Sequence, residues 1–204
     1  MKKGLLIFPI IIFGLFACSP TVQTSLPTAT LQPALASIAT ETPASSTSTG
    51  GCPSETTDLK LFMNANDGYC FLYPIGYASS PPYMVIINPN GISGGDSLPG
   101  DAVVIVNAEA ASGRTAAQVA DEQIAEAGEG FNITRTEIMI DGKQAIVVDG
   151  LPGQDPWREV FIVGNDRLYI LFFDPWVPAA DGFSELERLY SSVIASFHVL
   201  PPLP

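Results

Sequence analysis

Residues 158–173 read REVFIVGNDRLYILFF, and this stretch decides the fold class. Two runs rich in β-branched and aromatic residues, 158–163 and 167–173, flank residues 164–166, which are Gly, Asn and Asp. Strand-forming runs joined by a short turn of these residue types predict a β-hairpin. Because a hairpin joins antiparallel strands, the sheet that contains it is expected to be mainly antiparallel.

The other expected elements surround that hairpin. A second hairpin is predicted where 132–140 and 144–149 flank an Asp-Gly-Lys turn, and two amphipathic runs with capping-box starts predict helices. The remaining apolar runs, which predict strands, are 59–63, 69–73, 83–88 and 102–108, and the helices begin at Thr115 and Ser184. This order predicts an α+β domain with a mainly antiparallel sheet of about six to eight strands and two main helices packed on it.

Composition limits the function classes before any motif is considered. The 204-residue chain has 9 basic and 21 acidic side chains, a net charge of −12 and 47% hydrophobic residues. A chain this apolar is not wholly disordered, and a chain this acidic lacks the basic face that nucleic acid requires. One histidine and three cysteines argue against a zinc or multi-histidine metal centre. We therefore expect no nucleic-acid partner, no metal and no cofactor.

The segment 1–17 is expected to be a lipoprotein signal peptide. Two lysines precede an apolar run, Leu5 to Ala17, which is shorter than the roughly 20 residues of a membrane-spanning helix. Residues 15–18, Leu-Phe-Ala-Cys, resemble a bacterial lipobox. The resemblance implies cleavage before Cys18, a diacylglycerol thioether on its sulfur and usually a further acyl chain such as palmitate. It implies a lipid bilayer partner and a place on the extracytoplasmic face of a bacterial cell membrane. The alternative is an uncleaved anchor with a free thiol.

Residues 18–51 are expected to be the lipidated cysteine followed by a disordered tether. The stretch is mostly Ser, Thr, Pro, Ala and Gly, and Glu41 is its only charged residue. Such a composition cannot bury enough apolar surface to offset the entropy lost on ordering. The tether is expected to hold a single globular α+β domain, 52–204, clear of the bilayer.

Two segments of that domain resemble PsbP-like domains. Residues 68–77, Gly-Tyr-Cys-Phe-Leu-Tyr-Pro-Ile-Gly-Tyr, look like the family's opening motif, and residues 192–197, Ser-Val-Ile-Ala-Ser-Phe, resemble its closing helix. The order of elements also fits the family's α/β/α sandwich around an antiparallel sheet. The resemblance implies a non-enzymatic extracytoplasmic domain, sometimes a binding subunit of a larger membrane complex. It transfers no site residues.

Two cysteines remain once Cys18 is lipidated. Since exported proteins favour disulfides, Cys52 and Cys70 are expected to form one, with two free thiols as the alternative. The bond would attach the start of the domain to its second strand and stabilise it by roughly 3 kcal/mol.

The tripeptide Asp-Pro-Trp occurs twice, at 155–157 and at 174–176. Counting outward from the hairpin turn places Trp157 opposite Asp174 and Asp155 opposite Trp176, at the open end of the hairpin. The prolines stop strand pairing there, so two rings beside two carboxylates form a candidate binding rim. The alternative is that both rings cover the end of the core.

Two functions compete. The first is a non-catalytic binding or accessory module with no catalytic residues, anchored by lipid and holding a protein partner in a membrane complex. The second is an anchored hydrolase that uses carboxylates alone, among them Asp149, Asp155 and Asp174. A deep pocket holding two carboxylates with raised pKa values would favour the hydrolase.

Overall fold

The computed structural model describes residues 51–80, 85–87, 101–153 and 156–201. All of them belong to the second of two compact units, 43–204. The expected signal peptide, the lipidation site Cys18, nearly all of the tether and Asp155 lie outside the described residues. None of the helices in the described part is long and apolar enough to cross a membrane.

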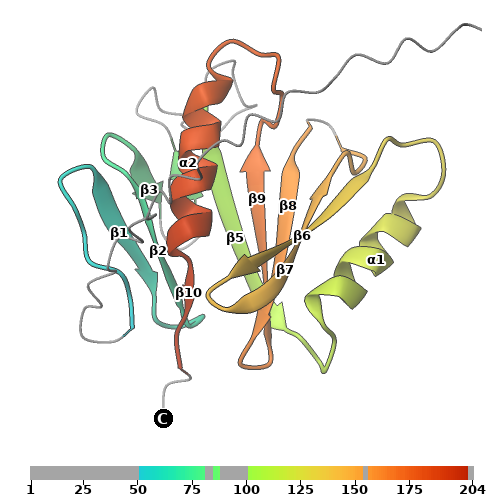
Figure 1. The fold of residues 1–204 in the computed structure, drawn as a ribbon, viewed down its shortest axis with the longest axis horizontal. Helices are drawn as coiled ribbons and strands as arrows, with labels where there is room; N and C mark the ends of the chain where they lie inside the picture. Colours follow the sequence, from blue (N-terminus) through green and yellow to red (C-terminus); the bar gives the residue numbers. More distant parts are fainter. Residues whose placement is uncertain (1–50, 81–84, 88–100, 154–155, 202–204) are drawn as a thin grey trace, which may run out of the picture. The chain divides into compact units, whose positions relative to one another are not determined.

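The described strands form two antiparallel sheets (Figure 1). The seven strands of the larger sheet, in order across it, are β3 (Ala78–Ser80), β4 (Val85–Ile87), β5 (Val103–Ala110), β9 (Arg167–Asp174), β8 (Arg158–Gly164), β7 (Lys143–Asp149) and β6 (Thr134–Ile140). The three strands of the smaller sheet are β1 (Leu59–Asn64), β2 (Tyr69–Pro74) and β10 (His198–Val199), with β2 in the middle. Both predicted hairpins are present, and in β8–β9 Gly164 pairs with Arg167 as the turn predicted.

The first helix, α1 (Ala116–Ala127), begins as its sequence predicts. The backbone N–H of Gln118 donates to the Thr115 hydroxyl at 3.2 Å, and the Thr115 N–H donates to the Gln118 side chain at 2.8 Å. This capping box satisfies donors that the first turn of a helix leaves without partners.

The second helix, α2 (Phe183–Ser196), begins differently from the prediction. Its N-cap is Gly182, which has a φ of 86° and provides no side-chain hydrogen bond, so the capping box predicted at Ser184 does not start the helix. A turn in which the Phe183 N–H donates to the Ala180 carbonyl leads into α2 instead. A positive φ suits glycine because it has no Cβ to clash.

The two helices cover opposite faces of the larger sheet. Along β8, Val160 and Ile162 belong to the hydrophobic cluster that contains α2, whereas Phe161 belongs to the cluster that contains α1. Successive side chains of a strand point to opposite faces, so this alternation assigns one helix to each. The smaller sheet contributes β2 residues, including Tyr69 and Phe71, to the α2 cluster. The expected α+β class with helices on both faces of an antiparallel sheet is thereby confirmed.

A disulfide joins Cys52 to Cys70 of β2, with the Cα atoms 6.0 Å apart, which confirms the expected pairing.

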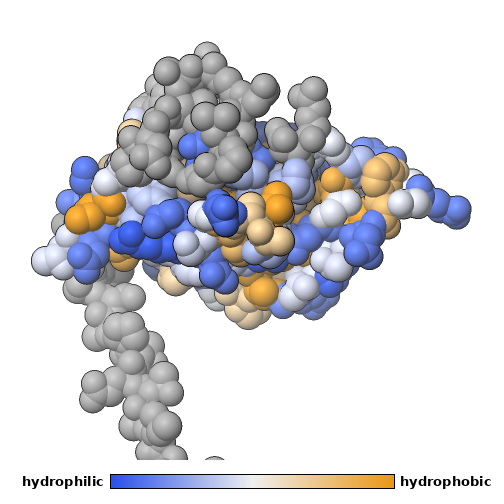
Figure 2. All heavy atoms as spheres, turned by 90° about the horizontal axis from the view of Figure 1, so that it is seen from above, coloured by the Kyte–Doolittle hydropathy of each residue, from blue (hydrophilic) through white to orange (hydrophobic). Residues whose placement is uncertain are grey.

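On the face that Figure 2 presents, the hydrophobic side chains form small separate patches among hydrophilic ones. Scattered exposed apolar side chains of this kind are ordinary for a folded protein and do not define a binding surface.

Candidate functional site

The candidate site lies at the open end of the β8–β9 hairpin, where the sequence places the two Asp-Pro-Trp segments. Arg158 pairs with Phe173 at the last rung of the ladder, so Trp157 and Asp174 are the next residues outward on the two strands. Beyond them the Trp176 N–H donates to the Pro156 carbonyl at 2.7 Å, which keeps the two segments side by side.

The two tryptophan rings nevertheless lie on opposite faces of the sheet. Trp157 lines a cavity together with residues of α1, whereas Trp176 packs edge-to-face against Phe183 and Tyr190 of α2, at centroid distances of 5.0 and 5.2 Å. Trp176 follows the last residue of β9, so the alternation of the strand does not set its direction. The structure therefore does not bring Trp157 and Trp176 together in one rim.

On the α2 face, Arg158 is held between two rings and a carboxylate. Its Cζ lies 3.7 Å from the Trp176 ring centroid and 4.9 Å from that of Tyr190. Its Nε and Nη2 donate to the two oxygens of Asp149 at 2.7 Å each. Bidentate pairing and cation–π contact are both stabilising, so Asp149 ties Arg158 to β7, and the Trp176 and Tyr190 rings tie it to α2.

On the α1 face, Trp157 binds a buried carboxylate. Glu159 is only 6% exposed, and the Trp157 indole N–H donates to its Oε1 at 2.7 Å. Among the described residues, this indole is the only partner of the Glu159 side chain, so Oε2 has no protein donor there. Burial raises the pKa of the Glu159 carboxyl, and the hydrogen bond from Trp157 opposes part of that rise. A carboxylate placed in this way gains from any donor that reaches it.

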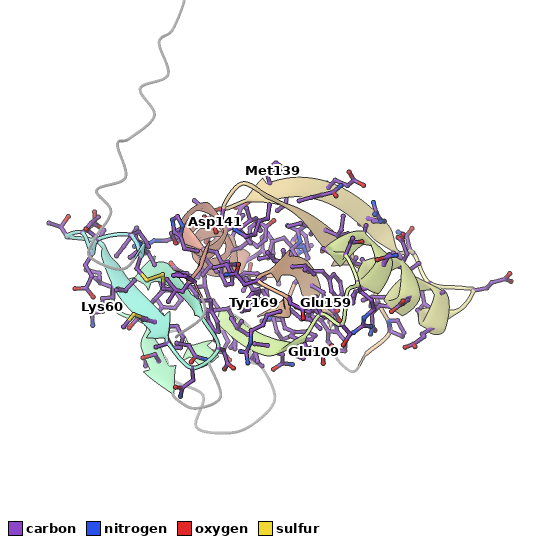
Figure 3. All side chains as sticks on the ribbon, turned by 90° about the horizontal axis from the view of Figure 1, so that it is seen from below. Lys60, Glu109, Met139, Asp141, Glu159 and Tyr169 are labelled. Carbon is purple, nitrogen blue, oxygen red and sulfur yellow. A yellow bond between two sulfur atoms is a disulfide. The ribbon has the colours of Figure 1, made fainter. Side chains whose placement is uncertain are left out.

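Glu159, labelled in Figure 3, lines a cavity of about 210 Å³ together with residues of the carboxyl-terminal half of α1. We call it the Trp157–Glu159 cavity. Its other lining residues are Gln123, Glu126, Ala127, Leu151 and Pro152. The site thus combines two carboxylates, one indole ring and an apolar wall. The ring is fixed in place, because its benzo edge lies against Gly153, where an added Cβ would overlap it.

Sequence reasoning did not single out Glu159. One signal was available: Glu159 lies two residues from Phe161, so strand alternation puts a carboxylate on a buried apolar face. Trp157 is two residues away in the other direction and shares that face, which is how its indole reaches Glu159.

Asp149 and Asp174, the two carboxylates considered for hydrolysis that the structure describes, do not converge. Asp149 lies on the α2 face with Val147 and is tied to Arg158. Asp174 follows Phe173, which faces α2, so strand alternation directs Asp174 toward the α1 face. The described part of the chain contains no group of three or more His, Cys, Asp or Glu side chains placed to hold a metal ion.

A second hollow, of about 250 Å³, lies where the β1–β2 and β8–β9 turns meet the C-terminal segment. Its main polar groups already have protein partners: Arg167 pairs with Asp67 at 2.7 Å, and the Tyr169 hydroxyl donates to the Asp67 carbonyl at 3.0 Å. The hollow therefore offers less to a ligand than the Trp157–Glu159 cavity.

Comparison with known proteins yields matches among solved structures. Neither a protein-family model nor a curated protein sequence matches the chain. The solution structure of cyanobacterial PsbP from Synechocystis sp. PCC 6803 is 17% identical, with 74% of this chain and 97% of that chain covered and a TM-score of 0.43. The crystal structure of a Pseudomonas aeruginosa protein of unknown function is 16% identical, with 66% and 90% covered and a TM-score of 0.38.

Proposed function

We propose that this protein is a lipid-anchored, extracytoplasmic binding module that holds a partner through the Trp157–Glu159 cavity. One observation carries the proposal. Glu159 is buried, accepts a hydrogen bond on Oε1 from a neutral donor, has no other side-chain partner among the described residues and lines a cavity beside the Trp157 ring. Leaving a buried carboxylate so incompletely paired costs stability, and a ligand that supplies the missing donor would remove that cost.

The anchored, extracytoplasmic placement has separate support. The lipobox-like residues 15–18 would attach the chain to a bilayer at Cys18. A coil of the tether's length has a root-mean-square span of roughly 30–35 Å, enough to lift the domain off the membrane. The disulfide between Cys52 and Cys70 suits an oxidising compartment outside the cytoplasm.

Binding is favoured over hydrolysis because Asp149 is held by Arg158 and Asp174 lies on the other face of the sheet. An anchored hydrolase is kept as the second candidate for one reason: Glu126 and Glu159 line the same cavity. Two carboxylates in one site are what acid–base hydrolysis of a glycosidic bond needs. A search for turnover of chromogenic glycosides, repeated with Glu159→Gln, distinguishes the two functions.

The binding proposal is tested with the full chain in bacterial cells. A photo-crosslinking residue replaces either Gln123, which lines the cavity, or Ala125, which is exposed on the same helix and does not. We expect labelled palmitate on the protein only when Cys18 is present. We also expect a defined crosslinked partner from position 123 and not from 125, lost with Trp157→Ala. Equal crosslinking from both positions, or no lipid label on Cys18, contradicts the proposal.

A further inference from the structure

We infer that the Trp157–Glu159 cavity binds an alkylammonium group, carried either by a lysine side chain or by a small free amine. The inference rests on the proposed function, because it names the chemistry of the group that the module holds.

The first argument is charge. The lining residues that the structure describes include two carboxylates, Glu126 and Glu159, and no basic side chain. Because Trp157 donates to Oε1 of Glu159 and no other described residue donates to this carboxylate, Oε2 is the acceptor left for a ligand. An ammonium group offers three donors and a positive charge, and a charge-assisted hydrogen bond is about twice as strong as a neutral one. A neutral donor would satisfy Oε2 without offsetting the buried charge.

The second argument is the indole ring. Cations bind to the faces of aromatic rings, and tryptophan is the strongest of the natural side chains in this respect. The Trp157 ring is held at both ends, by the hydrogen bond to Glu159 and by its contact with Gly153. A ring fixed before the ligand arrives loses little freedom on binding, which favours affinity.

The third argument is size. At about 30 Å³ for each water molecule, a cavity of about 210 Å³ holds roughly seven waters. Binding sites for whole small molecules are larger, about 300–1,000 Å³. The cavity therefore suits an end group with a short methylene stem. Ala127, Leu151 and Pro152 form the apolar wall along which such a stem packs while its charged end reaches Glu159.

The test uses the full chain in mild detergent with ¹⁵N-labelled tryptophan. The sequence has two tryptophans, so two indole N–H signals are expected, and Trp157→Phe identifies the one from Trp157. We expect butylammonium chloride to shift the Trp157 signal saturably and to leave the Trp176 signal in place. Pentan-1-ol, a neutral molecule of similar size, and glucose are expected to leave both signals in place.

Variants separate the site from general effects. Glu159→Gln keeps the shape of the side chain and removes its charge, and we expect it to weaken butylammonium binding at least about tenfold. Gly153→Ala displaces the ring without changing charge and is expected to weaken binding as well. Glu122→Gln removes one exposed carboxylate from the same helix outside the cavity and is expected to leave affinity unchanged. An unshifted Trp176 signal shows that each variant is folded.

The source of the amine is resolved by a lysine-containing peptide and its Nε-acetyl-lysine counterpart. Tighter binding of the lysine peptide than of butylammonium assigns the site to a protein partner, and weaker binding assigns it to a free amine. Equal shifts by pentan-1-ol or glucose, or full affinity in Glu159→Gln, overturn the inference. If no amine shifts the Trp157 signal but crosslinking from position 123 still depends on Trp157, the inference about the ligand is wrong and the proposed binding function is supported. If the crosslink is also absent, both the ammonium ligand and the proposed binding function are contradicted.

Discussion

Replacing Arg158 by methionine is expected to lower the free energy of unfolding by about 2–4 kcal/mol. The variant keeps an apolar stem between Trp176 and Tyr190 and removes the guanidinium. Two hydrogen bonds to Asp149, each 2.7 Å long, are lost with it.

The magnitude follows from the contacts. A hydrogen bond to a charged group contributes about 1.5–3 kcal/mol and a cation–π contact about 0.5–1 kcal/mol. The loss is expected to be smaller than the sum of these contributions. The Asp149 side chain is 28% exposed, so water can replace part of the hydrogen bonding that it loses with Arg158. For a domain of this size, a loss of about 2–4 kcal/mol lowers the melting temperature by about 4–16 °C.

The assay is thermal unfolding of the full chain in detergent, followed by circular dichroism. Arg135→Met is the matched control, because Arg135 also makes two ion pairs, at 2.9 Å each, with Asp121 and Glu137. Those partners are 61% and 54% exposed, so solvent screens both pairs and their loss is expected to cost much less than that of the Arg158 contacts. Equal destabilisation by the two variants would refute the argument that burial and ring contact give the Arg158 cluster its strength.

Three further predictions follow from the cavity, the disulfide and the anchor. Burial raises the pKa of Glu159 in the folded state above its ordinary 4.5, so the stability that its proton provides is present at low pH and is lost as pH rises through the folded pKa. Glu159→Gln is therefore expected to melt higher than the parent chain at pH 7 and equally at pH 4; a difference independent of pH contradicts this. Replacing Cys52 and Cys70 by serine together is expected to lower the stability by roughly 3 kcal/mol, measured by urea unfolding. Cys18→Ala is expected to abolish labelling by radioactive fatty acid and to leave an unprocessed or misprocessed chain on a gel.

Short sequence motifs predicted the elements that residues close together in the chain determine, such as turns and helix starts. The turn at 164–166 fixed the register of β8 and β9, and Thr115 and Gln118 fixed the start of α1. The strand β10 had no such signal, because it is two residues long and pairs with β2, more than a hundred positions earlier in the chain. A strand of two residues forms because it pairs with its neighbour, and two residues are too few to show a strand pattern in the sequence.

The part of the site that strand pairing determines could be predicted from the sequence, and the part that depends on the helices could not. The pairing of β8 with β9 ends at Arg158 and Phe173, one residue short of the expected pair of Trp157 and Asp174, which stays a prediction. The direction of the Trp176 ring depends on α2, which supplies Phe183 and Tyr190, so no count along the hairpin reveals it. Strand alternation places Glu159 on the same face as Phe161, but its burial depends on α1 covering that face, which the pattern of the strand alone does not show.

The disulfide also determines how the domain responds to mechanical tension. Cys70 lies in β2, between β1 and β10, and all six residues of β2 are buried. A pull on the chain ahead of Cys52 passes through the sulfur atoms directly to Cys70, the second residue of this strand. The intervening residues, β1 included, form a closed loop that carries no load. Reduction would transfer the force to β1, a strand paired on one side only, and it would peel away first. The covalent link thus moves the point where a pull on the preceding chain acts from β1 to a strand whose six residues are all buried.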